Sequence, residues 1–69
     1  MKKEISFINK LIKICKETKT NLWIVKFLNK EKNFIKNGLE SNFLQEIYQE
    51  YKNEQINIQG AIASCCMYF

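Results

Sequence analysis

Apolar residues recur at helical spacing in three successive stretches of this chain, and each stretch has a polar opposite face. The first stretch holds Ile5, Phe7, Ile8, Leu11, Ile12, Ile14 and Cys15 on one half of a helical wheel. The second holds Trp23, Ile24, Phe27, Leu28, Phe34 and Ile35, and the third holds Phe43, Leu44, Ile47, Tyr48 and Tyr51. Stripes of this kind need neighbouring elements to cover them. The sequence therefore predicts an all-α fold, a small three-helix bundle with helices over 3–18, 21–37 and 42–54.

Short polar segments between the stretches supply the helix ends. The N-cap candidates stand just before the second and third stretches: Thr20 or Asn21, and Ser41. The dipeptide Asn37-Gly38 predicts a left-handed stop for the second helix, after which Leu39 would fold back onto Phe34. Residues 22–28 have a competing interpretation as a β-strand, because Trp, Ile, Val and Phe favour sheets. Strict alternation is absent there, so we expect a helix.

Charge is distributed unevenly along the 69 residues. Residues 1–20 sum to +4, residues 21–38 to +3 and residues 39–55 to −3, whereas residues 56–69 carry no charge. The chain accordingly divides into a helical part, residues 1–55, and an apolar Cys-containing tail. A chain of this length forms one small domain that buries only about 60% of its unfolded surface, so a large active-site cavity is not expected.

Glu46, Glu50 and Glu54 are spaced four residues apart on the predicted third helix. Like charges at this spacing repel by a few tenths of a kcal/mol per pair, so a basic surface should face them. That surface is either the Lys-rich face of the first two helices or a basic groove on a partner protein. Under the second interpretation these three glutamates are partner-binding residues, and surface ion pairs are too weak to choose between the two.

Residue types that catalysis and metal binding need are missing from the chain. It has no His, Asp or Arg, no glycine-rich phosphate loop, and no Ser or Cys with an evident activating partner. Cys65 and Cys66 are adjacent, without the two-residue gap that suits zinc, and Cys15 is the third thiol. We therefore predict a non-enzymatic protein with no catalytic residue, no cofactor and no metal site.

The lysines of the first stretch allow a membrane interpretation. Lys10, Lys13 and Lys16, beside Phe7 and Leu11, are similar to an interfacial helix on an anionic membrane surface. We favour an ordinary bundle helix, because two further amphipathic helices can cover the apolar stripe. Three such stripes would also suit a homodimer. A nucleic-acid partner is not expected, because the predicted third helix is acidic and the chain lacks Arg.

No secretory signal or membrane span is evident in the sequence. Lys10, Lys13 and Lys16 interrupt the apolar positions near the N-terminus, and no stretch reaches the length of a membrane span. We predict a cytoplasmic protein whose three Cys remain thiols, and any peptide released from the tail would be the secreted part.

The uncharged tail, residues 56–69, has two interpretations. It can pack on the bundle and complete a core too small to stand alone, through Ile56, Ile58, Ile62, Cys65, Met67 and Phe69. Alternatively it is displayed for chemistry through Cys65 or Cys66. Under the second interpretation, residues 66–69 place a Cys where a geranylgeranyl-type prenylation box has it, although Tyr68 is not aliphatic.

Residues 62–69 resemble the staphylococcal autoinducing peptides, in which a few exocyclic residues precede a Cys that closes a five-residue thiolactone ending in bulky apolar residues. The resemblance implies a ring from Cys65 to Phe69, with Tyr68 and Phe69 as the apolar pair. That family also has an acidic extension beyond the ring, which does not follow Phe69 here. The adjacent Cys66 leaves the ring-forming thiol open.

A helical leader followed by a short Cys-containing core is also the layout of ribosomally made, enzymatically modified peptides. Gly60-Ala61 resembles the small-residue pair after which peptidase-transporters cut leaders. We therefore predict a precursor of a small signalling or bacteriocin-type peptide, with a leader recognised by a maturation enzyme or exporter and a core near residues 62–69. Gly60 and Ala61 would be the cleavage site, and Cys65 or Cys66 the modification site. The alternative is a small helical regulator or inhibitor that binds a partner protein and packs its tail in the core.

Overall fold

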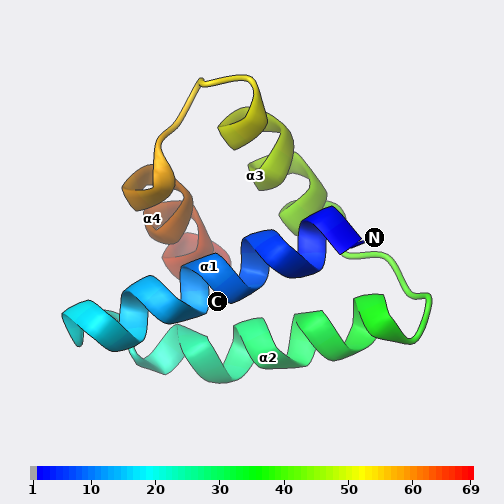
Figure 1. Ribbon diagram of the computed structural model, residues 1–69, viewed down its shortest axis with the longest axis horizontal. Helices are drawn as coiled ribbons and strands as arrows, with labels where there is room; N and C mark the ends of the chain where they lie inside the picture. The colour runs from blue at the N-terminus through cyan, green and yellow to red at the C-terminus, as the bar shows by residue number, and fades with distance from the viewer. Residues whose placement is uncertain (1) are drawn as a thin grey trace.

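The computed structural model describes residues 2–69, which form four α-helices joined by short loops (Figure 1). They are α1 (Lys2–Thr18), α2 (Trp23–Lys36), α3 (Asn42–Lys52) and α4 (Ile58–Tyr68). The all-α prediction is confirmed, and the strand interpretation of residues 22–28 is wrong because α2 occupies nearly all of that segment. The prediction of three helices is also wrong, because the tail expected at residues 56–69 contains a fourth.

The helices pack as two pairs (Figure 1). α1 and α2 run side by side along the long axis of the molecule, and α3 and α4 form a second pair that packs on α1. α1 contacts all three other helices and is therefore the central element of the fold. No helix within residues 2–69 has both the length and the apolar content that crossing a bilayer requires.

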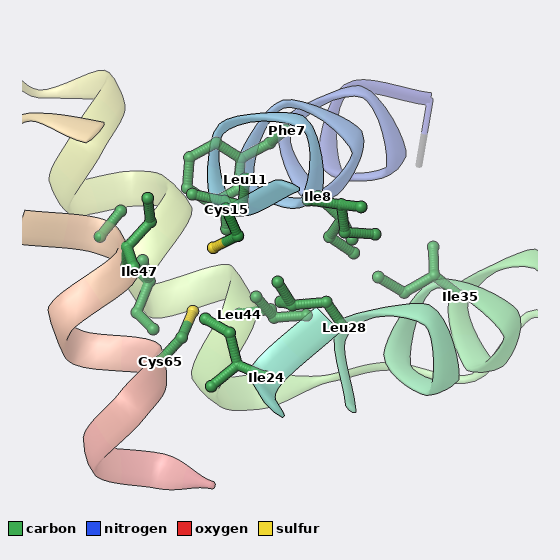
Figure 2. Close-up of a cluster of buried hydrophobic side chains, with 13 residues drawn as sticks. Phe7, Ile8, Leu11, Cys15, Ile24, Leu28, Ile35, Leu44, Ile47 and Cys65 are labelled. Atoms are coloured by element: carbon green, nitrogen blue, oxygen red, sulfur yellow. The ribbon is translucent and has the colours of Figure 1, made fainter. Parts of the chain in front are cut away.

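A single apolar cluster fills the space between the four helices (Figure 2). Its buried members are Phe7, Ile8, Leu11, Ile12 and Cys15 of α1, Ile24, Leu28 and Ile35 of α2, Leu44 and Ile47 of α3, and Ala61, Ile62 and Cys65 of α4. Figure 2 shows Cys65 pointing from α4 into the same space as Ile24 and Leu44. The apolar stripe of α1, which allowed a membrane interpretation, is thus covered from inside the protein.

The C-terminus of α2 has the geometry that its sequence predicts. Gly38 adopts the left-handed conformation, with φ of 81°, just after the C-cap residue Asn37. The Leu39 N–H donates to the Phe34 carbonyl at 2.9 Å, and the Gly38 N–H donates to the Ile35 carbonyl at 3.0 Å. This pair of hydrogen bonds is a Schellman motif, so the predicted stop at Asn37-Gly38 is confirmed.

The C-termini of α1 and α3 end in the same way without a glycine. Lys19 and Glu54 take the left-handed conformation, with φ of 54° and 61°. The Thr20 N–H donates to the Cys15 carbonyl at 3.3 Å, and the Gln55 N–H donates to the Glu50 carbonyl at 2.9 Å. α3 therefore ends at Lys52, and the predicted extension of the third helix to residue 54 is wrong.

The N-caps predicted for the second and third helices agree less well with the structure than the predicted C-terminal stop of α2 does. α2 begins at Trp23 after Leu22, so the N-cap expected at Thr20 or Asn21 is wrong. Ser41 is the N-cap residue of α3, as predicted, but its side chain makes no cap hydrogen bond. The Ser41 Oγ is buried, and within residues 2–69 it has no hydrogen-bond partner.

Replacing Gly38 with Ala should destabilise the protein by about 1 kcal/mol, because an L side chain is strained at positive φ. A Cβ at this position meets no atom within 4 Å, so the cost is conformational and not steric. Thermal unfolding followed by circular dichroism should show a melting temperature lowered by about 4–8 °C. The matched change Lys19→Gly should raise the melting temperature, because it relieves the same strain at the end of α1. A Gly38→Ala variant that melts at or above the original temperature would contradict this account.

Candidate protein-interaction surface

The fourth helix is uncharged and mostly apolar, with Gln59 and Ser64 as its polar side chains. It begins at the N-cap Asn57, whose side-chain oxygen accepts the Gly60 N–H at 2.8 Å, and no residue from Ile58 to Tyr68 is charged. One side of α4 places Ala61, Ile62 and Cys65 in the core. Met67, on the opposite side, is 89% exposed, and Tyr68, in the last turn, is 56% exposed. A mostly apolar helix is normally covered over most of its surface, but among the described residues nothing covers Met67 on the outer side of α4.

Aromatic rings from three helices meet beside the end of α4. Trp23 contacts Phe27 edge to face with ring centroids 6.2 Å apart, and Phe27 stacks on Phe69 at 5.1 Å. Phe43 contacts Phe69 at 5.2 Å and stacks on Tyr68 at 4.7 Å. We call these five rings, together with Leu22 and Met67, which are next to Trp23 and Tyr68 in the sequence, the aromatic surface. Each such ring contact contributes roughly 0.5–1.5 kcal/mol beyond area burial, so the cluster also holds α4 against α2 and α3.

Much of the aromatic surface is open to solvent. Trp23 is 48% exposed and Leu22 is 50% exposed at the start of α2. The rings of Phe27, Phe69 and Phe43 connect Trp23 to Tyr68, so the two exposed aromatic side chains belong to one continuous cluster. Exposed apolar clusters of this kind often mark interaction sites. Lys26 lies over the Phe27 ring, with its Nζ 5.7 Å from the ring centroid, and marks the basic border of the surface on α2.

A groove of about 380 Å³ between α3 and α4 continues from this surface. Its lining residues are Glu46, Ile47 and Glu50 of α3 and Ser64, Met67 and Tyr68 of α4. Ile47 is buried, whereas Glu46 and Glu50 are exposed. The groove therefore combines an apolar side on α4 with two carboxylates on α3.

The three glutamates predicted to bind a partner do not form one row. Glu46 and Glu50 lie one turn apart on α3 and share the groove, but Glu54 lies in the turn beyond α3. Glu54 instead borders a separate hollow together with Tyr51 and Asn57. The placement of Glu54 on the third helix is therefore wrong, because α3 stops at Lys52.

The lysines whose contacts the structure shows reach groups other than these glutamates. Lys10 Nζ donates to the Tyr51 hydroxyl at 2.9 Å and lies 5.4 Å from the centroid of the same ring. Lys32 Nζ donates to the Asn9 side-chain oxygen at 3.1 Å. These bonds tie α1 to α3 and to α2. They lend no support to the interpretation that the basic face of the first two helices opposes the acidic row.

The two cysteines predicted as modification sites differ in environment. Cys65 is fully buried, and Cys66 is half-buried. Burial raises the pKa of the Cys65 thiol to about 12, and the neighbouring Cys66 and Cys15 thiols add to the shift. Burial also raises the pKa of the Cys15 thiol. A thiol in this state is a poor nucleophile, because the thiolate is the reactive form.

The predicted cleavage site lies inside a helix. Gly60 and Ala61 belong to the first turn of α4, and Ala61 is fully buried. A protease cleft binds extended chain, so cutting there would require α4 to leave the core first. Cleavage at Gly60-Ala61 and modification at Cys65 or Cys66 stay predictions.

No protein-family model, no curated protein and no solved structure matches this chain. Within residues 2–69, no group of three or more His, Cys, Asp and Glu side chains is arranged to hold a metal ion. Only the contacts and exposures of the described residues therefore point to the aromatic surface and the groove as a site.

The aromatic surface was not among the sites predicted from the sequence. Trp23 and Phe27 were predicted on the buried stripe of a bundle helix, Tyr68 in a ring structure, and Phe69 either in the core or in that ring. The sequence offered one signal for this surface, the aromatic content of the chain. Five of the nine aromatic residues meet here, but they are separated along the chain by as many as 46 positions, from Trp23 to Phe69.

Proposed function

We propose that this protein is a small, non-enzymatic helical regulator that binds a partner protein through the aromatic surface. The observation that carries the proposal is α4, an uncharged helix whose inner side completes the core while Met67 and Tyr68, in its last turn, are open to solvent. The tail is thereby both part of the fold and part of the contact surface.

The residue types of the surface support a protein partner. Trp, Tyr, Phe and Met are enriched in protein–protein interfaces, and Trp and Tyr dominate binding hot spots. Trp23 and Tyr68 already pack on neighbouring rings, so little side-chain freedom remains to be lost on binding. Glu46 and Glu50 at the border would form part of a polar rim.

The peptide-precursor hypothesis is the second candidate, and the sulfur of Cys66 is the observation in its favour. Cys66 is half-buried near the end of α4, so a maturation enzyme could reach it more easily than Cys65. Intact-mass measurement of the protein from the cells that make it separates the two candidates. A regulator should be present as the unmodified chain, whereas a precursor should yield a shortened or modified species.

Site-specific photo-crosslinking tests the proposed binding surface. A photoreactive amino acid replaces Met67 in one variant and Lys13, which is exposed on α1, in a matched control. After irradiation in the cells that make the protein, the Met67 variant should give one dominant protein adduct and the Lys13 variant should not. Adding Trp23→Ala should weaken the adduct at position 67. Absence of an adduct at that position, or the same adducts at both positions, would contradict the proposal.

A further inference from the structure

The groove between α3 and α4 has the form of a site for one more helix. Ser64, Met67 and Tyr68 are spaced at i, i+3 and i+4, so they share one side of α4. Glu46 and Glu50 are spaced at i and i+4 on α3, with Ile47 between the two helices. Two packed helices that present such rows offer a groove in which a third helix can lay its apolar side.

The side chains around the groove select for a basic occupant. Glu46 and Glu50 place two exposed carboxylates one turn apart at its edge. A Lys or Arg of an incoming helix could lay its methylene stem on Met67 and set its charged end beside a carboxylate. The Tyr68 ring, 56% exposed, adds a face for cation–π contact, and the flexible Met67 side chain adapts to uneven apolar shapes.

Two other occupants fit less well. A second copy of this chain would have to offer a basic amphipathic helix, but the apolar sides of α1 and α2 are already buried in their own core. An anionic membrane surface would meet Glu46 and Glu50 at the groove, where like charges oppose the approach. Light scattering detects the first of these occupants, and binding to anionic vesicles detects the second.

The geometry points to a basic amphipathic helix of a partner protein as the occupant of the α3–α4 groove, with its Lys or Arg side chains on Glu46 and Glu50. This assignment rests on the proposed function and adds the chemistry of the partner. It also explains why the outer side of α4 carries no charge: that side would be covered in the complex.

Two designed peptides test the assignment on the intact protein. Both have Leu at helical spacing, and the remaining positions are Lys in one peptide and Glu in the other. Fluorescence anisotropy at low salt should show binding of the Lys peptide, with an affinity at least about tenfold higher than for the Glu peptide. Backbone amide shifts on binding should be centred on Glu46, Glu50, Met67 and Tyr68. Equal binding of the two peptides, or shifts centred elsewhere, would overturn the assignment.

A charge-swap variant provides the matched control. Glu46→Lys with Glu50→Lys should weaken the Lys peptide by at least about tenfold and create binding of the Glu peptide. Glu17→Lys with Glu40→Lys changes the net charge equally at exposed positions outside the groove and should leave the preference unchanged. If the swap variant failed to fold, the peptide pair on the unaltered chain would still decide.

The remaining outcomes separate this inference from the proposed function. A dimer in light scattering whose interface includes Met67, or binding to anionic vesicles through the same residues, would overturn the basic-helix assignment. A crosslinked protein at position 67 combined with no peptide preference would leave the proposed function standing and remove only this assignment. Absence of any crosslinked protein at position 67 would instead remove the proposed function itself.

Discussion

Removal of residues 60–69 is expected to abolish cooperative thermal unfolding. The deletion takes Ala61, Ile62 and Cys65 out of the core and removes Phe69 from its contacts with Phe27 and Phe43. Loss of one buried Ile side chain typically costs about 2–5 kcal/mol, and a natural domain has only about 5–15 kcal/mol in total. A chain of this size lies at the low end of that range. Circular dichroism should show reduced helicity beyond the missing residues and no sharp transition.

Two substitutions in α4 provide the matched controls for the deletion. Ile62→Ala removes a buried side chain and should cost roughly 2–5 kcal/mol, enough to lower the melting temperature by more than 8 °C. Met67→Ala removes a side chain of similar size that is 89% exposed, and should change the stability by less than about 0.5 kcal/mol. If the shortened chain melted sharply near the original temperature, α4 would not belong to the core.

Cys65 should be alkylated about a thousandfold more slowly in the folded protein than in the unfolded chain. Burial raises the pKa of this thiol from 9.0 to about 12, and each pKa unit lowers the thiolate fraction at neutral pH tenfold. Labelling with iodoacetamide, followed by fragmentation mass spectrometry, should find Cys66 labelled first. Cys65→Ala should preserve the fast reaction, and Cys66→Ser should remove it. Equal labelling rates at Cys65 and Cys66 would contradict the buried position.

The same thiol makes stability depend on alkaline pH. The folded-state pKa of Cys65 lies above the unfolded value of 9.0. The contribution of the neutral, buried thiol to the free energy of unfolding is therefore complete below pH 9 and is lost as the pH rises toward 12. The slope is at most about 1.4 kcal/mol per pH unit. Urea titrations of the unaltered chain and of Cys65→Ala should be compared, so that the effect of this thiol is isolated. Parallel curves for the two proteins would contradict the raised pKa.

The first three helices could be predicted because each has two chemically different sides. Leu11, Leu28 and Ile47 recur in stripes that mark the buried side, and the lysines and glutamates mark the other. Gly38 gave the end of α2, because glycine is the usual residue at a left-handed helix stop. The ends of α1 and α3 were harder, because Lys19 and Glu54 adopt the same conformation without that signal.

The fourth helix was not predicted because it has no charged side. Periodicity reveals a helix only through contrast between its sides, and residues 58–68 hold no charged side chain and only two polar ones, Gln59 and Ser64. The one local signal was Asn57, an N-cap residue whose side chain accepts the Gly60 N–H. The aromatic surface could not be predicted from the sequence for a different reason. Phe27, Phe43 and Phe69 become neighbours only when α2 and α3 pack with the C-terminal end of the chain.

Native-state hydrogen exchange is the most direct measurement of the role of α4. Amides of buried residues in α4, such as Ile62 and Cys65, should exchange with the same free energy of opening as those of Leu11 and Ile24 in α1 and α2. That result would show that α4 opens only when the whole protein unfolds. Exchange at Ile62 and Cys65 with an opening free energy near zero, while Leu11 and Ile24 stay protected, would contradict the account and favour a detachable tail.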